Sequence, residues 1–312
     1  MASACESDTL RHAVAAAGRE PAVALQSLIN DAKVKLLAFG ENHWWNNPHR
    51  HLLSASMPLL ARHGFTHLAL ELEPHYQPIL DSYVAGLIGR AELESSLIDA
   101  GGSLANELSA PCPGFFGLLE SARNAGVSLL TIDKDKSDRY WYHADFANQP
   151  RERHMAERID EVLQQAPDKK VVVLCGSNHL YRRPREAQSE FPSMFELLAE
   201  RLMQAGDRLS SVAAVLYTDR QMAGLTFAHL YAITTWTQEP ICVSTQDCSA
   251  VSQLYLGEDR RCPWGGCFAG KLDECPGIAH GICTAIPMSP ILAGYWDALV
   301  FYPAGWNRLQ TR

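Results

Sequence analysis

Short apolar runs alternate along the chain with longer stretches in which apolar residues recur every three to four positions. The short runs have the length and β-branched content of buried strands, and the longer stretches have the period of amphipathic helices. Helices are predicted at about 8–29, 48–64, 77–88, 91–100, 115–125, 151–165 and 194–205. Strands are predicted at 34–39, 65–74, 126–133, 170–176, 209–217 and 295–305.

This alternation indicates one fold class. Strands separated by helices of about ten or more residues form βαβ units, whose strands pair in parallel and whose helices cover both faces of the sheet. We therefore expect a three-layer α/β/α fold with a mostly parallel central sheet. Residues 220–290 have a poor helical pattern and many Gly, Pro and Cys residues. They are interpreted as a long Cys-rich C-terminal excursion within a single domain that spans residues 1–312.

Two predicted strands end in nearly the same four residues. The first strand closes in Gly-Glu-Asn-His (40–43), and the fourth closes in Gly-Ser-Asn-His (176–179). Each glycine lets the chain turn sharply, and ligands of such sheets bind beyond the carboxyl ends of the strands. His43 and His179 are therefore expected at one cleft, together with Glu71 at the end of the second strand.

Imidazole and carboxylate side chains at one edge allow two kinds of chemistry. They could hold a divalent metal ion with coordination positions open to water. Without a metal, they could serve as a general base and an orienting acid for attack by water. Asp133 and Asp135 either add a carboxylate to this site or cap a turn. The residues alone leave these alternatives open.

Four segments resemble one protein family in the expected order. The stretch LLAFGENHWWNNPHRHLLSASMPLLARHGFTHLALELEP resembles the opening of the erythromycin esterase/ChaN-like superfamily, which is related to the TraB and Tiki proteins. RERHMAERI is similar to a helix of the esterase branch, and VVVLCGSNHLYR resembles the second Gly-x-x-His strand of the Tiki/TraB branch or its counterpart in the esterases. WDALVFYP is similar to the closing strand.

The resemblance implies a catalytic site of five residues. Glu41 and His43 match the first motif, Glu71 the glutamate of the second strand, Arg151 the helix arginine, and His179 the second histidine. The Tiki branch implies His43, Glu71 and His179 as ligands of a divalent ion such as Mn, Co or Zn. The esterase branch implies a histidine that activates water without an obligatory metal. ChaN-like relatives imply haem as a minor alternative cofactor.

The first functional hypothesis is therefore a hydrolase that cleaves an amide or ester bond of a peptide or small molecule, with a divalent metal. In it, Glu41 supports an imidazole or acts as general base, and Arg151 polarises a carbonyl or holds a carboxylate. The alternatives are a metal-independent esterase and a non-catalytic binding protein, either a haem binder or an effector that engages a partner.

Net charge and hydropathy limit the kinds of partner and the cellular location that we expect for this protein. A net charge of −8 excludes a general affinity for nucleic acid or anionic membranes. No apolar run approaches the roughly 18–20 residues that span a bilayer. The start of the sequence lacks the pattern of a secretory signal. A cytoplasmic location is the default expectation, and secretion without a classical signal peptide fits the same sequence.

The cysteines leave the redox compartment open. Six of the nine lie in the C-terminal third, without a C-x-x-C pair, which disfavours a structural zinc knuckle. Their even number fits disulfides in an oxidising compartment and equally fits free thiols.

Overall fold

The computed structural model of the protein describes residues 4–41, 48–101, 114–135, 150–166, 168–176, 179–180, 192–215, 233–245, 247–248 and 297–303. Its helices are α1 (Ala4–Ala17), α2 (Pro21–Ile29), α3 (Pro48–Arg62), the 3-10 turn η1 (Pro74–Tyr76), α4 (Gln77–Val84), α5 (Arg90–Asp99), α7 (Phe115–Asn124), α9 (Pro150–Gln165) and α10 (Met194–Gln204). Its strands are β1 (Val34–Glu41), β2 (Phe65–Leu70), β3 (Ser128–Thr131), β4 (Lys170–Gly176), β5 (Arg208–Val215), β6 (Ile241–Ser244) and β7 (Ala298–Phe301).

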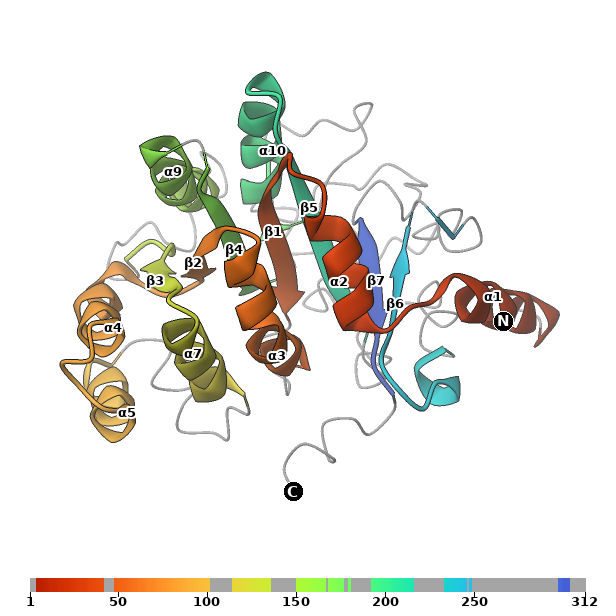
Figure 1. Ribbon diagram of the computed structural model, residues 1–312, viewed down its shortest axis with the longest axis horizontal. Helices are drawn as coiled ribbons and strands as arrows, with labels where there is room; N and C mark the ends of the chain where they lie inside the picture. Colours follow the sequence, from red (N-terminus) through yellow and green to blue (C-terminus); the bar gives the residue numbers. More distant parts are fainter. Residues whose placement is uncertain are drawn as a thin grey trace, which may run out of the picture.

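The seven strands form one sheet in the order β3-β2-β4-β1-β5-β7-β6. All neighbours pair in parallel except β6 and β7, which are antiparallel. Figure 1 shows that the sheet lies between two groups of helices, with α2, α3 and α7 on one face and α9 and α10 on the other. The predicted α/β fold with a mostly parallel central sheet is confirmed.

Two hydrophobic cores lie on opposite faces of this sheet, because successive side chains of a strand point to opposite sides. In β1, Leu37 and Phe39 pack in the core that includes α2, α3 and α7, whereas Leu36 and Ala38 pack in the core that includes α9 and α10. Burial on both faces explains why these strands read as continuous apolar runs rather than as alternating ones. The sheet is therefore a fixed platform from which residues after the strand ends project.

The predicted helix at 8–29 is two helices. Pro21 begins α2 and has no N–H to continue the helical ladder, so the chain breaks between Ala17 and Pro21. The segment between the two helices pairs with the edge strand β6, because Arg19 and Cys242 form an antiparallel bridge with two backbone hydrogen bonds of 2.9 Å. The helical period at 8–29 is thus real, but one proline divides it.

The Cys-rich excursion supplies a strand that the periodicity did not predict. β6 lies within it and pairs with β7, so part of residues 220–290 returns to the edge of the sheet. Cys175, Cys242 and Cys248 are buried free thiols. The remaining cysteines of the cluster, Cys262, Cys267, Cys275 and Cys283, lie outside the described residues.

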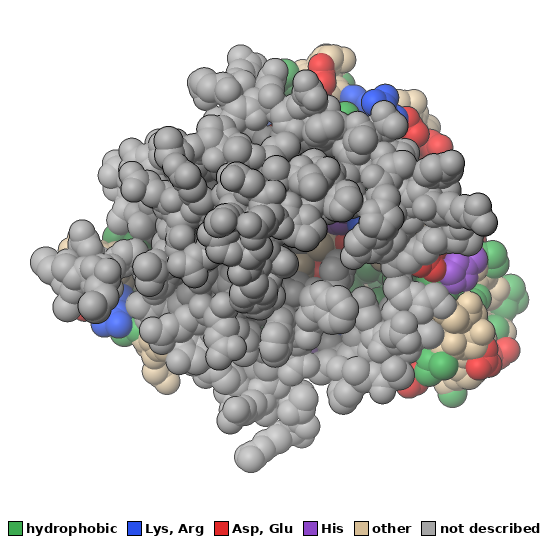
Figure 2. All heavy atoms as spheres, turned by 180° about the vertical axis from the view of Figure 1, so that it is seen from behind, with side chains coloured by type: hydrophobic (Ala, Val, Ile, Leu, Met, Phe, Trp, Pro, Cys, Tyr) green, Lys and Arg blue, Asp and Glu red, His purple; other side chains and the backbone are tan. Residues whose placement is uncertain are grey.

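The outer surface of the helices is mixed in charge. Figure 2 shows acidic and basic side chains intermixed at the top of the molecule, where Figure 1 places α10. Arg201 of α10 forms an ion pair with Asp160 of α9, with Nη1 and Oδ2 2.8 Å apart. No helix in the described ranges is long and apolar enough to cross a membrane.

Candidate functional site

Charged side chains gather where four neighbouring parallel strands end. Glu41 is the last residue of β1 and is paired in register with Gly176, the last residue of β4. Glu71 follows β2 directly, and Asp133 lies two residues after β3. His179 follows β4 by three residues. The carboxyl edge of β3-β2-β4-β1 therefore carries Glu41, Glu71, Asp133 and His179, at the strand ends where ligands of such sheets bind.

Arg151 is the centre of an ionic network at this edge. Its Nη2 lies 2.5 Å from Oε1 of Glu71, and its Nε and Nη2 donate to both oxygens of Asp133 at 2.7 and 2.9 Å. The second oxygen of Glu71 accepts from the backbone N–H of Gly176 at 2.6 Å. Asp133 is almost fully buried. One guanidinium thus ties the end of β2 to the end of β3.

His179 is held between two carboxylates. Its Nδ1 lies 2.6 Å from Oε1 of Glu152, and its Nε2 lies 3.2 Å from Oε1 of Glu71. Nη1 of Arg151 is 3.4 Å from the same Nε2. The other oxygen of Glu152 accepts from the backbone N–H of Met194 at 2.8 Å. Arg151 Nη1 and His179 Nε2 therefore converge beside Glu71.

The ionisable groups of this network shift one another's pKa values. Burial alone would lower the pKa of His179, but attraction to Glu152 and Glu71, with hydrogen bonds to both, raises it to about 9. Burial alone would raise the pKa of Glu152, but His179 and then Arg151 lower it. Burial opposes the charge of Arg151 as well, yet Glu71 and Asp133 raise its pKa. The two carboxylates therefore favour the protonated form of His179.

The packing of α9 explains why Arg151 and Glu152 point into the site. Met155, Ala156 and Ile159 are buried against the sheet. Arg151 lies four residues before Met155, and Glu152 lies four residues before Ala156, so both continue the inner stripe of the helix. That stripe passes from apolar to ionic where the first turn of α9 reaches the sheet edge.

A second ion pair lies on the other side of β4. Arg50, in the first turn of α3, donates from Nε and Nη2 to the two oxygens of Glu41 at 3.2 and 2.9 Å, and both side chains are buried. The neighbouring His49 contacts the hydroxyl of Tyr302 at 2.9 Å. Glu41 and Arg50 thus join the two ends of the β1–α3 connection. His43 belongs to that connection and lies outside the described residues.

The arrangement of Glu71 and His179 does not fit a divalent ion held between them. The atoms that would bind it, Glu71 Oε1 and His179 Nε2, both face the guanidinium of Arg151. A divalent cation bound to both atoms would lie directly beside this guanidinium, and like charges repel strongly at short range. Within the described residues, no group of three or more His, Cys, Asp or Glu side chains is arranged to hold a metal ion.

Sequence reasoning missed two residues of the site. Glu152 and Arg50 were not candidates, and Asp133 was considered only as an alternative to a turn residue. The available signal for Glu152 was its place on the inner stripe of a helix whose next inner residues are apolar. Arg50 follows the same logic, since it precedes the buried Leu53 by three residues.

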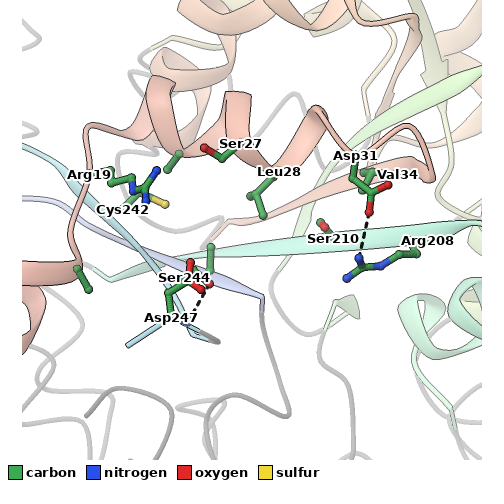
Figure 3. A pocket seen from close by; sticks show the side chains of 13 residues that line it. Arg19, Ser27, Leu28, Asp31, Val34, Arg208, Ser210, Cys242, Ser244 and Asp247 are labelled. Carbon is green, nitrogen blue, oxygen red and sulfur yellow. Dashed lines mark hydrogen bonds and ion pairs between the residues drawn. The ribbon is translucent and has the colours of Figure 1, made fainter. Parts of the chain in front are cut away.

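A separate cavity of about 310 Å³ lies toward the opposite end of the sheet. Figure 3 shows it beneath α2, with Val34 at the start of β1 and Arg208 and Ser210 at the start of β5. Arg208 is paired with Asp31, with Nη1 and Oδ2 3.0 Å apart. The cavity therefore lies away from the strand ends at which Glu71 and His179 meet.

Comparison with solved structures gives the same fold. The chain is similar to a mutant of the erythromycin esterase EreC in its open conformation, with 12% identity, a TM-score of 0.52, and coverage of 87% of this chain and 91% of that one. It is similar to a protein from Bacillus cereus, with 12% identity, a TM-score of 0.51, and coverage of 96% and 97%. The predicted likeness to the erythromycin esterases is confirmed at the level of the fold.

Other similar structures match less of the fold. ChaN of Campylobacter jejuni, a structure of cofacial haem binding, matches with 14% identity, a TM-score of 0.40, and coverage of 61% of this chain and 85% of that one. Bacterial protein toxins match with 22–23% identity and a TM-score of 0.45 over 67% of this chain. The chain spans 39% of the length of those toxin structures. No family model and no curated protein matches the sequence.

Proposed function

We propose that this protein is a hydrolase that cleaves an ester or amide bond of a small molecule or peptide, without a metal shared by Glu71 and His179. The observation that carries the proposal is that the guanidinium Nη1 of Arg151 and Nε2 of His179 lie 3.4 Å apart, beside the carboxylate of Glu71. Such a pair suits an oxygen that gains negative charge during attack on a carbonyl group.

The two donors have different tasks in this reaction. Arg151 keeps its proton, so it can only stabilise the charge on the carbonyl oxygen. His179 can stabilise that charge and also give up the proton on Nε2. Because the pKa of His179 is raised to about 9, the proton is present at neutral pH and is transferred as the leaving group gains basicity. His179 is therefore assigned as the general acid.

Water requires a base on the same side of the sheet. His43 is the candidate, since the sequence places it two residues after Glu41 at the end of β1. Glu41 itself is assigned a supporting role, because both of its oxygens accept from Arg50. The proton of water passes to the base, a hydroxide oxygen bonds to the carbonyl carbon, and the leaving group departs with the proton of His179. One water molecule is added across the broken bond.

Hydrolysis of a panel of activated esters and anilides by the purified protein tests the proposal. His179→Asn should lower kcat/KM by about 10²- to 10⁴-fold, the usual contribution of a general acid. His12→Asn is the matched control, because His12 is exposed on α1, where its Nδ1 contacts the backbone oxygen of Asp8. Wild-type protein without turnover on any substrate of the panel, or full turnover by His179→Asn, would contradict the assignment.

The haem alternative has a test of its own. An absorbance scan of protein titrated with haemin shows a shifted Soret band if an axial ligand is provided. A hydrolase of the proposed kind shows no saturable Soret shift, and its turnover survives a chelator. Saturable haem binding by a protein that has no hydrolytic activity would support the binding protein instead.

A further inference from the structure

We propose that Glu152 is a positioning residue that assigns proton transfer to Nε2 of His179, and that the N-terminus of α10 holds Glu152 in place. This inference rests on the proposed function, because it explains which nitrogen of His179 works. Glu152 was not among the residues that the motifs point to. Its role follows from its two contacts and its place on α9.

Both oxygens of Glu152 are engaged. Oε1 lies 2.6 Å from His179 Nδ1, and Oε2 accepts from the backbone N–H of Met194 at 2.8 Å. The carboxylate is mostly buried, with 17% of the side chain exposed. A carboxylate accepts hydrogen bonds and has no proton to donate, so Nδ1 must carry the proton in this contact. The carboxylate of Glu152 therefore keeps a proton on Nδ1 of the imidazole.

Fixing the proton on Nδ1 leaves only Nε2 to change. With Nδ1 protonated, Nε2 has a proton in the imidazolium and a lone pair in the neutral ring. Nε2 is the atom that faces Glu71 Oε1 and Arg151 Nη1. A group that held Nδ1 by donating to it would select the other neutral tautomer, with the proton kept on Nε2. Glu152 thus turns His179 into a proton donor and acceptor at the side of the reacting carbonyl.

The start of α10 is built to keep this carboxylate still. Ser193 caps the helix and forms a capping box with Glu196, in which each side chain accepts from the other residue's backbone N–H. Met194 is the first residue of the helix, so its N–H has no partner within the helix and is given to Glu152. The first turns of α9 and α10 meet at the carboxylate of Glu152. The position of His179 therefore depends on the distance between these two helices.

Glu152→Gln gives the direct test. An amide cannot accept from both His179 and Met194 in the same orientation, because one end donates. We expect kcat to fall at least about 10-fold while KM stays within about two-fold, as for other residues that orient a catalytic group. Glu157→Gln is the control, since Glu157 is exposed on the same helix. Glu152→Asp should recover part of the lost kcat.

Nitrogen NMR of labelled histidine makes the test independent of turnover. Nδ1 of His179 should be protonated in the wild type and in Glu157→Gln, and the Nδ1 signal should change in Glu152→Gln. An unchanged Nδ1 signal in Glu152→Gln overturns the inference, whether or not the protein is a hydrolase. A changed signal with unchanged kcat overturns the positioning role. Absence of turnover in the wild type, with the NMR change present, contradicts only the proposed function.

A second pair of variants tests the contact with α10 without changing Glu152. Met194→Pro removes the N–H but suits the first position of a helix, and Met194→Ala removes the same side chain while keeping the N–H. The proline variant should show a lower kcat than the alanine variant and a shifted Nδ1 signal. Equal kcat and equal signals in the two variants would show that α10 does not hold the carboxylate.

Discussion

Nη2 of Arg151 lies 2.5 Å from Oε1 of Glu71, so a helix residue and a strand-end residue 80 positions apart share one charge centre. The same guanidinium also holds Asp133, and its third nitrogen faces His179. Two cations and three carboxylates, those of Glu71, Asp133 and Glu152, therefore depend on one another at the carboxyl edge of the sheet. Removing one of these groups leaves a neighbouring charge buried without its full set of partners.

Loss of the Arg151 charge should destabilise the fold. Arg151→Met leaves the carboxylates of Glu71 and Asp133 without their cation, and removing one partner of a buried pair costs about 3–5 kcal/mol. The free energy of unfolding from urea titration measures this. Arg158→Met is the control on the same helix, where an exposed pair with Glu161 contributes about 0–1 kcal/mol. Equal losses in the two variants would contradict the central role of Arg151.

His49 should make the fold sensitive to acid. Burial lowers its pKa to about 3, and the charge of Glu41 opposes this only in part. Since the folded pKa is below the unfolded value of about 6.5, the stability from neutral His49 is complete above pH 6.5 and is lost as pH falls toward 3. The unfolding free energy should fall by about 1.4 kcal/mol per pH unit from this group.

Two variants isolate that slope. His49→Asn should reduce the pH dependence of the unfolding free energy between pH 6 and 4, whatever its effect on stability at pH 8. His12→Asn, at an exposed site, should leave the slope as it is in the wild type. A slope that is unaffected by His49→Asn would assign the acid sensitivity to other groups.

Metal removal should have little effect on the protein. Because the guanidinium of Arg151 lies beside both Glu71 Oε1 and His179 Nε2, dialysis against a chelator should leave kcat/KM and the thermal midpoint unchanged. Elemental analysis of the untreated protein should find less than one equivalent of Mn, Co or Zn. Stoichiometric metal that disappears in His179→Ala would overturn the metal-free site and restore the first hypothesis from the sequence.

Gly114 should be hard to replace. It precedes α7 with φ of 81°, and a Cβ there would lie 3.1 Å from Arg50 Cβ and from His51 Nε2. Gly114→Ala combines left-handed backbone strain of about 1–2 kcal/mol with this contact. Gly126→Ala is the matched control, because Gly126 has φ of 72° but nothing within 4 Å of the added Cβ. Calorimetry of both variants should show the larger loss at Gly114, together with reduced activity if Arg50 is displaced.

The sequence determined the layers of this protein and the edge at which its chemistry lies. Apolar runs such as Leu36–Phe39 specify buried strands because both faces of the sheet are covered, and the helical period between them requires parallel crossovers. Glu71 and His179 follow the ends of two such strands, so their meeting at one edge could be predicted without coordinates. The pattern of apolar residues did not predict that Pro21 divides the first helix, and it did not predict the short strand β6.

Only the tertiary structure decided which charges pair. The resemblance pointed to Arg151, and Asp133 was an alternative between a site carboxylate and a turn residue, but their pairing with each other and the part played by Glu152 come from the packing of α9 on the sheet. The reason is physical: local periodicity fixes which side of an element is buried, whereas a hydrogen bond depends on distances between elements set by the whole core. The resemblance implied a metal ion held by His43, Glu71 and His179, and the tertiary structure adds that the guanidinium of Arg151 contacts both Glu71 and His179.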